Sequence, residues 1–272
     1  MILRRAYALL KTTHPVPSVA VATFTALFAI GFGLPIEQLV IVSLSVLTQQ
    51  FSVGLSNDWL DYDRDKLGHR LDKPTARGEV SITQVRNFSF VAAAISLVLA
   101  FSLGSATGLM MIAMLVVGWS YNLGLKSTGL SIVPYAIGFG ILPIFVTLAF
   151  DPPTMPDWWV ILASALLGIS AHFANTLPDL FADRETGVRA LPHIVGQKVS
   201  AIVIAVSAAS ASLLVVTQSL EIDSFVAALG FAFTLALALA ASVLALRSKP
   251  PRIIFHLLLV ACLVNVILLM LG

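Results

Sequence analysis

Two short stretches of the chain carry amide and carboxylate side chains at the same intervals. Both read Asn-x3-Asp-x3-Asp followed by a basic residue, at Asn57, Asp61 and Asp65 and again at Asn175, Asp179 and Asp183. Residues four positions apart lie on one face of a helix, so each stretch would form a polar stripe. Carboxylates at this spacing repel one another and need a counter-charge, and Mg²⁺ takes such oxygen ligands together with water and substrate phosphates. The stripes therefore favour a Mg²⁺-bridged diphosphate.

The elements that must position these residues are apolar helices. The chain has 272 residues, of which 58% are hydrophobic and 11% are charged, whereas a soluble globular domain carries about 25% charged residues. A membrane-spanning helix needs about 20 mostly apolar residues. Nine segments are candidates, at about Val16–Leu34, Ile36–Gly54, Val85–Leu103, Gly108–Tyr121, Ile132–Phe150, Trp158–Thr176, Ala201–Thr217, Phe225–Leu246 and Ile253–Leu271. The sequence predicts an all-α polytopic membrane protein with nine transmembrane helices.

The basic residues fall on one side of this predicted membrane. All 16 Lys and Arg residues lie in the N-terminal segment or in the connections after the second, fourth, sixth and eighth helices. The other connections hold only acidic charges, at Glu37, Asp151, Asp157, Glu221 and Asp223. By the positive-inside rule, the N-terminus and the aspartate-rich loops lie in the cytoplasm and the C-terminus lies outside. We expect an integral membrane protein of a cell inner membrane.

Each stripe begins where an even-numbered helix leaves the membrane, the second helix for Asn57 and the sixth for Asn175. This offset of four helices indicates an internal repeat. We predict a single domain over residues 1–272, with repeated halves at about 1–127 and 128–246.

A solvated, charge-balanced loop would explain one such stretch. Asp58 adds a further carboxylate to the first stripe, because it stands three positions before Asp61 and so shares its helix face. Two matched stretches at equivalent places favour a functional site, because polar groups near a membrane core are costly and usually functional.

The first stretch, NDWLDYDRD, and the second, NTLPDLFAD, resemble the two aspartate-rich motifs of the UbiA superfamily of intramembrane prenyltransferases. The segment YNLGLKS, with Tyr121 and Lys126, resembles the Tyr-x-x-x-Lys element that these proteins carry after the fourth helix, here with one extra residue between. The second motif departs from the first, since Thr176 stands where the first has Asp58. The resemblance covers essentially the whole chain.

This resemblance implies two four-helix bundles around a central cavity that opens sideways to lipid, plus a ninth helix. It implies a Mg²⁺-dependent prenyltransferase, which moves an isoprenoid chain from an allylic polyprenyl diphosphate to a small acceptor, often aromatic. The expected partners are the polyprenyl diphosphate, the acceptor and the lipid bilayer, with no nucleic acid. The basic residues near the motifs would stabilise the charge that grows on the leaving diphosphate.

The resemblance also implies roles for single residues. The Mg²⁺ ligands would be Asp58, Asp61, Asp65, Asp179 and Asp183. The catalytic residues would be Asp61, Asp179, Lys126 and Tyr121, and the substrate contacts would be Asn57, Asn175, Arg70, Arg184 and His172. Lys126 would bind a diphosphate oxygen, and Tyr121 would line the pocket of the carbocation or the acceptor. The two asparagines would orient the aspartates or act as ligands themselves.

Some of these residues also fit a plainer role. Tyr121 fits an interfacial aromatic and Lys126 fits a basic marker of the cytoplasmic side. His172 fits a packing residue as well as an acceptor contact or a base. Lys11 and His14, at the start of the first spanning helix, fit either interface anchors or groups at the level of the phosphates.

Three other functions compete with the transferase. A membrane terpene cyclase would quench the carbocation internally, and a polyprenyl-phosphate phosphoribosyltransferase would take its diphosphate from the sugar. An ion-binding transporter would bind ions without chemistry. A transporter predicts charged or broken helices near the bilayer midplane, whereas the acidic stripes lie at one surface, so the pattern favours an enzyme.

Overall fold

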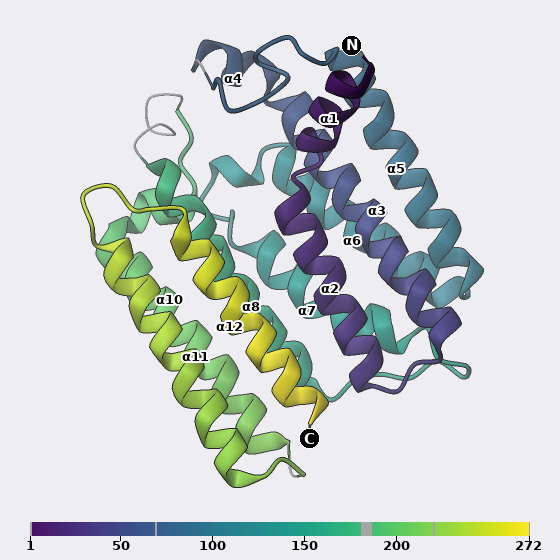
Figure 1. The fold of residues 1–272 in the computed structure, drawn as a ribbon, viewed down its shortest axis with the longest axis vertical. Coiled ribbons are helices and arrows are strands. Elements are labelled where there is room, and N and C mark those ends of the chain that lie inside the picture. Colours follow the sequence, from purple (N-terminus) through teal and green to yellow (C-terminus); the bar gives the residue numbers. More distant parts are fainter. Residues whose placement is uncertain (1, 69, 181–186, 220, 272) are drawn as a thin grey trace. The chain divides into compact units, whose positions relative to one another are not determined.

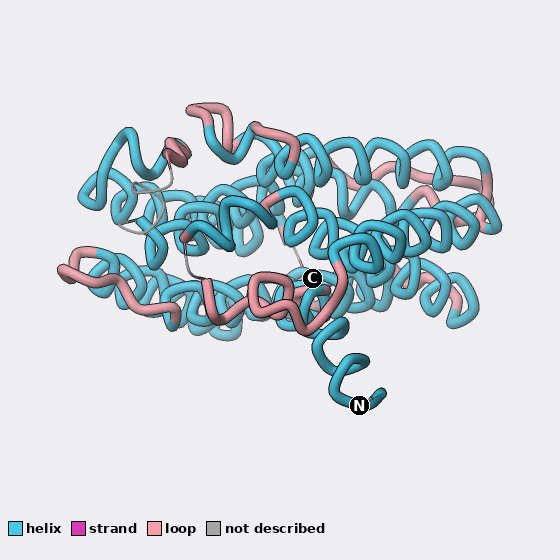
Figure 2. The backbone as a smooth tube through the Cα atoms, turned by 90° about the horizontal axis from the view of Figure 1, so that it is seen from above, coloured by secondary structure: helices cyan, strands magenta, loops and turns pink. Residues whose placement is uncertain are grey.

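The computed structural model describes residues 2–68, 70–180, 187–219 and 221–271. Figure 1 shows the course of the chain, and Figure 2 shows that its described part consists of helices joined by loops, without a strand. The predicted all-α class is therefore confirmed for the described residues. The chain divides into two compact units. The first unit comprises Met1–Ala26 and Pro35–Gly124, and the second comprises Leu27–Leu34 and Leu125–Gly272.

The first unit is built around one long helix. Its helices are α1 (Ile2–Thr12), α2 (Pro15–Gly31) as far as Ala26, α3 (Ile36–Leu60), α4 (Tyr62–Leu67), α5 (Ile82–Ser102) and α6 (Ser105–Asn122). Helices α5 and α6 both pack against α3 (Figure 1). At the end of α3 that carries the first motif, Ala8, Leu55 and Val85 form a buried cluster with Val80. The end of α3 is therefore packed against α1 and α5.

The second unit surrounds α8. Its elements are η1 (Leu125–Ser127), α7 (Val133–Thr147), α8 (Trp158–Thr176), η2 (Leu177–Asp179), α10 (Leu191–Gln218), α11 (Ser224–Ala245) and α12 (Ile253–Met270). Helix α8 packs against α7, α10 and α12. A Cβ at Gly168 would lie 2.6 Å from the Tyr135 carbonyl oxygen, so α7 approaches α8 where the side chain is absent. The core of the unit includes Phe173, Leu177 and Ile204.

All nine predicted segments lie on helices. Six described spans are long and apolar enough to cross a membrane, namely Ile36–Leu60, Ile82–Ser102, Trp158–Asp179, Leu191–Gln218, Ser224–Ala245 and Ile253–Met270. Two further helical stretches, Arg5–Thr12 and Pro15–Gly31, are long and apolar enough to cross a membrane only when taken together, and the angle between them is 59°. The apolar helix Val133–Thr147 is shorter. The count of nine spans, and the two four-helix bundles around a cavity with a ninth helix, stay predictions.

Candidate active site

The first aspartate-rich motif lies where α3 ends and α4 begins. Backbone hydrogen bonds run from Asp61 N to Asn57 O at 3.0 Å and from Asp65 N to Asp61 O at 2.8 Å. The four-residue spacing of the stripe is therefore kept across the junction of the two helices. Both helices bring polar side chains of this motif into the interior of the first unit, where Asp58, Asp61 and Asp65 are buried.

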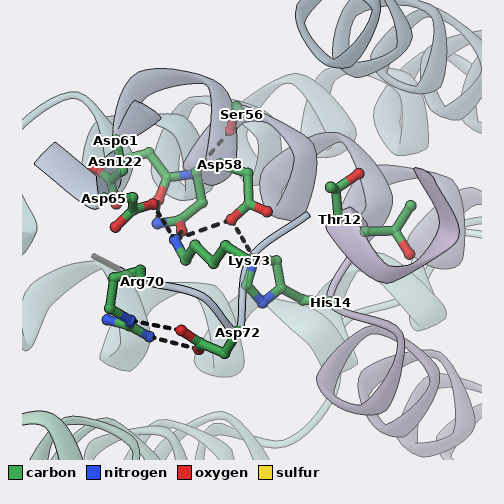
Figure 3. Close-up of polar contacts among 12 residues, drawn as sticks. Thr12, His14, Ser56, Asp58, Asp61, Asp65, Arg70, Asp72, Lys73 and Asn122 are labelled. Atoms are coloured by element: carbon green, nitrogen blue, oxygen red, sulfur yellow. Dashed lines mark hydrogen bonds and ion pairs between the residues drawn. The ribbon is translucent and has the colours of Figure 1, made fainter. Parts of the chain in front are cut away.

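Three oxygens of the motif converge on the ammonium of Lys73, which lies in the loop after α4 (Figure 3). The Lys73 Nζ lies 2.6 Å from Asp65 Oδ2 and 3.0 Å from Asp58 Oδ1. It donates a longer hydrogen bond, of 3.4 Å, to Asn57 Oδ1. Asp61 adds to the negative charge around the ammonium and is itself paired with Arg64. The centre of the motif thus holds a buried cation that the chain supplies.

The charge of Lys73 is stabilised by these acids. Burial alone would lower the pKa of the Lys73 ammonium, but the carboxylates of Asp58 and Asp65 outweigh burial and raise the pKa above its usual value. Lys73 is therefore protonated throughout the physiological pH range.

A second nitrogen reaches the same Asp58 oxygen. His14 Nε2 lies 2.9 Å from Asp58 Oδ1. His14 stands between α1 and α2 with a φ of 51°. A Cβ at Gly54 would lie 2.5 Å from the Thr13 carbonyl oxygen, so the absence of a side chain there lets this turn approach α3. Of the two roles that the sequence left open for His14, the structure supports the one at the motif.

Asn122, at the end of α6, sets the orientation of the Asn57 amide. Its Nδ2 donates to the Val53 carbonyl oxygen and to Ser56 Oγ, each at 2.8 Å. The side-chain oxygen of Asn122, Oδ1, consequently accepts a hydrogen bond of 3.1 Å from Asn57 Nδ2. The side-chain oxygen of Asn57, Oδ1, therefore faces the Lys73 ammonium.

Arg70 is paired with an acid of its own loop. Its guanidinium forms two hydrogen bonds with the Asp72 carboxylate, at 3.0 and 3.1 Å, beside the cluster in Figure 3. This pair lies in the same loop as Lys73, and its role as a substrate contact stays a prediction.

The second motif is built differently. Helix α8 ends at Thr176 and a 3₁₀ turn, Leu177–Asp179, follows. Pro178 explains the change, because proline lacks an N–H and disfavours the α conformation at the preceding residue. Asn175 and Asp179, the described residues of the second stripe, therefore do not share one α-helix, contrary to the prediction.

The second motif also has different partners. Asn175 Nδ2 donates to the hydroxyl of Tyr135 at 3.2 Å. Asp179 Oδ1 lies 3.7 Å from Arg252 Nη2, and the Asp179 side chain is 36% exposed. Asp183 and Arg184 lie outside the described residues, so their predicted roles are not tested.

His172 lies in the interior of the second unit. Its Nε2 is 3.0 Å from Ser131 Oγ, which accepts a hydrogen bond of 2.9 Å from Leu191 N. Its ring centroid is 4.8 Å from that of Tyr135. These contacts give His172 a packing role at the starts of α7 and α10, and its role toward the acceptor stays a prediction.

The remaining predicted residues lie at the junction of helix and loop. Tyr121 is half-buried in the last turn of α6, and Lys126 is buried in η1. Their assignments to the pocket and to the diphosphate stay predictions.

The donor set of the first motif fits Mg²⁺. Within the described residues, no three His, Cys, Asp or Glu side chains are grouped closely enough to hold a metal ion. The Asn57 amide oxygen and the carboxylates of Asp58 and Asp65 nevertheless converge on one cation, the Lys73 ammonium. One amide oxygen and two carboxylates are ligands that Mg²⁺ takes, with water and phosphate completing its shell.

The model of the UbiA prenyltransferase family matches residues 15–269. The chain belongs to the UbiA prenyltransferase family. This match includes both aspartate-rich motifs and confirms the family that the sequence resembles. No curated protein matches the chain.

Solved UbiA structures share the fold. A UbiA homologue from Aeropyrum pernix K1 has a TM-score of 0.77 at 17% identity, over 92% of this chain and 96% of that one. A structure described as digeranylgeranylglyceryl phosphate synthase has a TM-score of 0.70 at 17% identity, over 99% and 98%. A homologue from Archaeoglobus fulgidus bound to GPP and Mg²⁺ has a TM-score of 0.68 at 16% identity, over 96% and 98%. The chain therefore has a UbiA-like fold. Its several apolar helices and its family indicate an integral membrane protein.

Sequence reasoning missed three residues that position the UbiA motifs. Lys73 was counted only among the basic residues of the loop, although its charge next to an acidic stripe was a usable signal. Asn122 was visible beside Tyr121 in YNLGLKS, where a polar side chain ends an apolar helix. Tyr135 offered no signal, because its contact with Asn175 joins two separate helices.

Proposed function

We propose that the protein is a Mg²⁺-dependent intramembrane prenyltransferase that transfers an isoprenoid chain from an allylic polyprenyl diphosphate to a small acceptor, often aromatic. The observation that carries the proposal is the convergence of Asn57, Asp58 and Asp65 oxygens on one cation, in a chain of the UbiA family. The A. fulgidus homologue bound to GPP or DMAPP with Mg²⁺ supports the same substrate class.

We assign the following roles to the side chains. The Mg²⁺ ligands are Asp58, Asp61, Asp65, Asp179 and Asp183, and Asn57 and Asn175 orient or complete them. Bound Mg²⁺ would supply positive charge that stabilises the diphosphate as it leaves. Lys126, Arg70 and Arg184 add positive charge for diphosphate oxygens.

The reacting carbon needs an environment that water does not reach, because water would quench an allylic cation. Tyr121 would line this part of the pocket and stabilise the cation through its ring face. His172 would contact the acceptor from the second unit.

The proposed orientation places the N-terminus and both motifs in the cytoplasm and the C-terminus outside, since all 16 Lys and Arg lie on one predicted side.

The proposal is tested by incubating the purified protein in detergent with Mg²⁺, a labelled allylic diphosphate and a panel of small aromatic acceptors. We expect release of pyrophosphate and a prenylated acceptor, and loss of both in Asp61→Ala and Asp179→Ala. Asp63→Ala is the matched control, because Asp63 is an exposed acid of the same motif. Full activity in both test variants would refute the metal assignment.

The same assay separates the alternatives. Pyrophosphate release without an acceptor, together with a cyclic hydrocarbon, would identify a terpene cyclase. Turnover only with phosphoribosyl diphosphate and a polyprenyl phosphate would identify the sugar transferase. Divalent-ion uptake into proteoliposomes without any turnover would identify a transporter.

A further inference from the structure

We propose that Lys73 is a resident cation of the first motif, which holds the oxygens of Asn57, Asp58 and Asp65 together until a divalent cation replaces it. This inference rests on the proposed function, since it assigns a positioning residue to the same metal site. It concerns a residue in a loop, outside the aspartate-rich motif itself.

The contacts of Lys73 are those of an ion in a site. Its ammonium reaches two carboxylates and one amide oxygen at 2.6, 3.0 and 3.4 Å, and its side chain is only 11% exposed. The neighbouring Lys66 differs, because its ammonium lies over the Tyr62 ring, 5.8 Å from the centroid, and its side chain is exposed. The convergence is therefore particular to Lys73 and not a general property of the basic loop.

The backbone of the loop aims Lys73 at the motif. Lys73 N donates to the Arg70 carbonyl oxygen at 3.0 Å, and the Lys73 carbonyl oxygen accepts from Arg77 N at 3.2 Å. The Arg77 guanidinium in turn bonds the Leu71 carbonyl oxygen at 2.6 Å and pairs with Glu79 at 2.9 Å. These turns place the start of the Lys73 side chain, while its four-carbon stem leaves the ammonium able to move.

A lysine and a divalent cation compete for these oxygens. Mg²⁺ binds oxygen ligands at about 2.0–2.1 Å, so it cannot share their centre with an ammonium. Without any cation, two buried carboxylates would repel each other and remain uncompensated, which is strongly destabilising. Lys73 removes that cost in the metal-free protein, and its displacement lowers the apparent affinity for metal in return.

The test is the binding of Mn²⁺, a hard divalent ion that accepts the same ligands, to the full-length protein in detergent. Free Mn²⁺ is followed by electron paramagnetic resonance, and thermal unfolding is measured with and without the metal. We expect Lys73→Met to bind Mn²⁺ about tenfold more tightly than the wild type, because the ion no longer has to displace the ammonium. We expect this variant to melt at a lower temperature without metal and to gain more from Mn²⁺.

Three further variants control the experiment. Lys66→Met removes the same charge from the same part of the chain and should bind Mn²⁺ as the wild type does. Lys73→Arg keeps the charge and should restore the wild-type stability without metal. Lys73→Gln, which keeps a polar group near the acids, replaces Lys73→Met if that protein does not fold.

The outcomes separate this inference from the proposed function. If the wild type binds Mn²⁺ and loss of the Lys73 charge leaves the affinity unchanged or weakens it, the resident-cation role is wrong while the metal site stands. An equal gain in Lys66→Met would also overturn the inference, because the effect would then be general electrostatics. A wild type that binds no Mn²⁺ would overturn both proposals.

Discussion

The two aspartate-rich motifs share a spacing of residues and differ in how the chain neutralises them. In the first motif, Asp65 is 3% exposed and lies 2.6 Å from a buried lysine. In the second, Asp179 is 36% exposed and lies 3.7 Å from Arg252, whose side chain is 66% exposed. An acid in water needs little compensation, whereas a buried acid needs a partner. The described part of the first motif thus has a buried counter-charge, whereas Asp179 of the second faces an exposed one.

Two substitutions between the motifs explain this difference. The position of Asp58 in the first motif is taken by Thr176 in the second, and the Thr176 hydroxyl bonds the His172 carbonyl oxygen at 2.9 Å. The position of Leu60 is taken by Pro178, which ends the α-helix. The second motif consequently lacks the acid at the position of Asp58 and has a different backbone at the point where its acids begin.

We expect the largest effect on activity from exchanging the first of these residues. Asp58→Thr gives the first motif the side chain of the second and removes the acid that His14 and Lys73 share. We expect pyrophosphate release to fall by about 100- to 1,000-fold, the range seen when one group that stabilises a transition state is lost. Asp63→Thr, at an exposed acid of the same motif, should retain activity. Comparable losses in both variants would show that the buried acid and the exposed acid matter equally for activity.

The reverse exchange should act on stability. Thr176→Asp would add a carboxylate at a buried position of the second unit. Removing the partner of a buried charge typically costs about 3–5 kcal/mol, and we expect an unfolding free energy lower by about 3 kcal/mol. Chemical denaturation in detergent measures this change, with Thr176→Asn as the uncharged control. An unchanged stability would mean that the second motif also holds a buried counter-charge.

The next prediction concerns the hydrogen bond by which Asn122 orients Asn57. Asn122→Leu would remove the acceptor of the Asn57 amide and release its orientation. We expect about tenfold weaker Mn²⁺ binding, as for other partners that orient metal ligands. Ser120→Ala, on the same helix, removes a hydroxyl that bonds only within α6 and should bind the ion normally. Normal binding in Asn122→Leu would show that Asn57 needs no such support.

The smallest effect is expected at Arg252. Arg252→Gln removes a partner that is mostly exposed, and exposed ion pairs contribute about 0–1 kcal/mol. We therefore expect less than about 1 kcal/mol of lost stability in the same denaturation experiment. A larger loss than that of Lys73→Gln would reverse the proposed difference between the motifs.

The fold was largely predictable because membrane helices are long and apolar. The predicted segment Trp158–Thr176 coincides with α8, and the stripe of the first motif follows from helical spacing alone. The change to a 3₁₀ turn after Thr176 could also have been predicted, since proline acts on its own neighbours. Tertiary contacts were not predictable, because the Lys73 ammonium reaches Asp58 only after the loop has folded back on α3.

The most direct test of the central claim is pyrophosphate release by the wild type and by Asp65→Asn across a Mg²⁺ titration. This isosteric change removes the charge of the acid that contacts Lys73 most closely. If the first motif is a metal-dependent diphosphate site, the wild type releases pyrophosphate only when Mg²⁺ is present, and Asp65→Asn releases little at any concentration. Release without a divalent cation, or an unchanged titration curve for Asp65→Asn, would contradict the account.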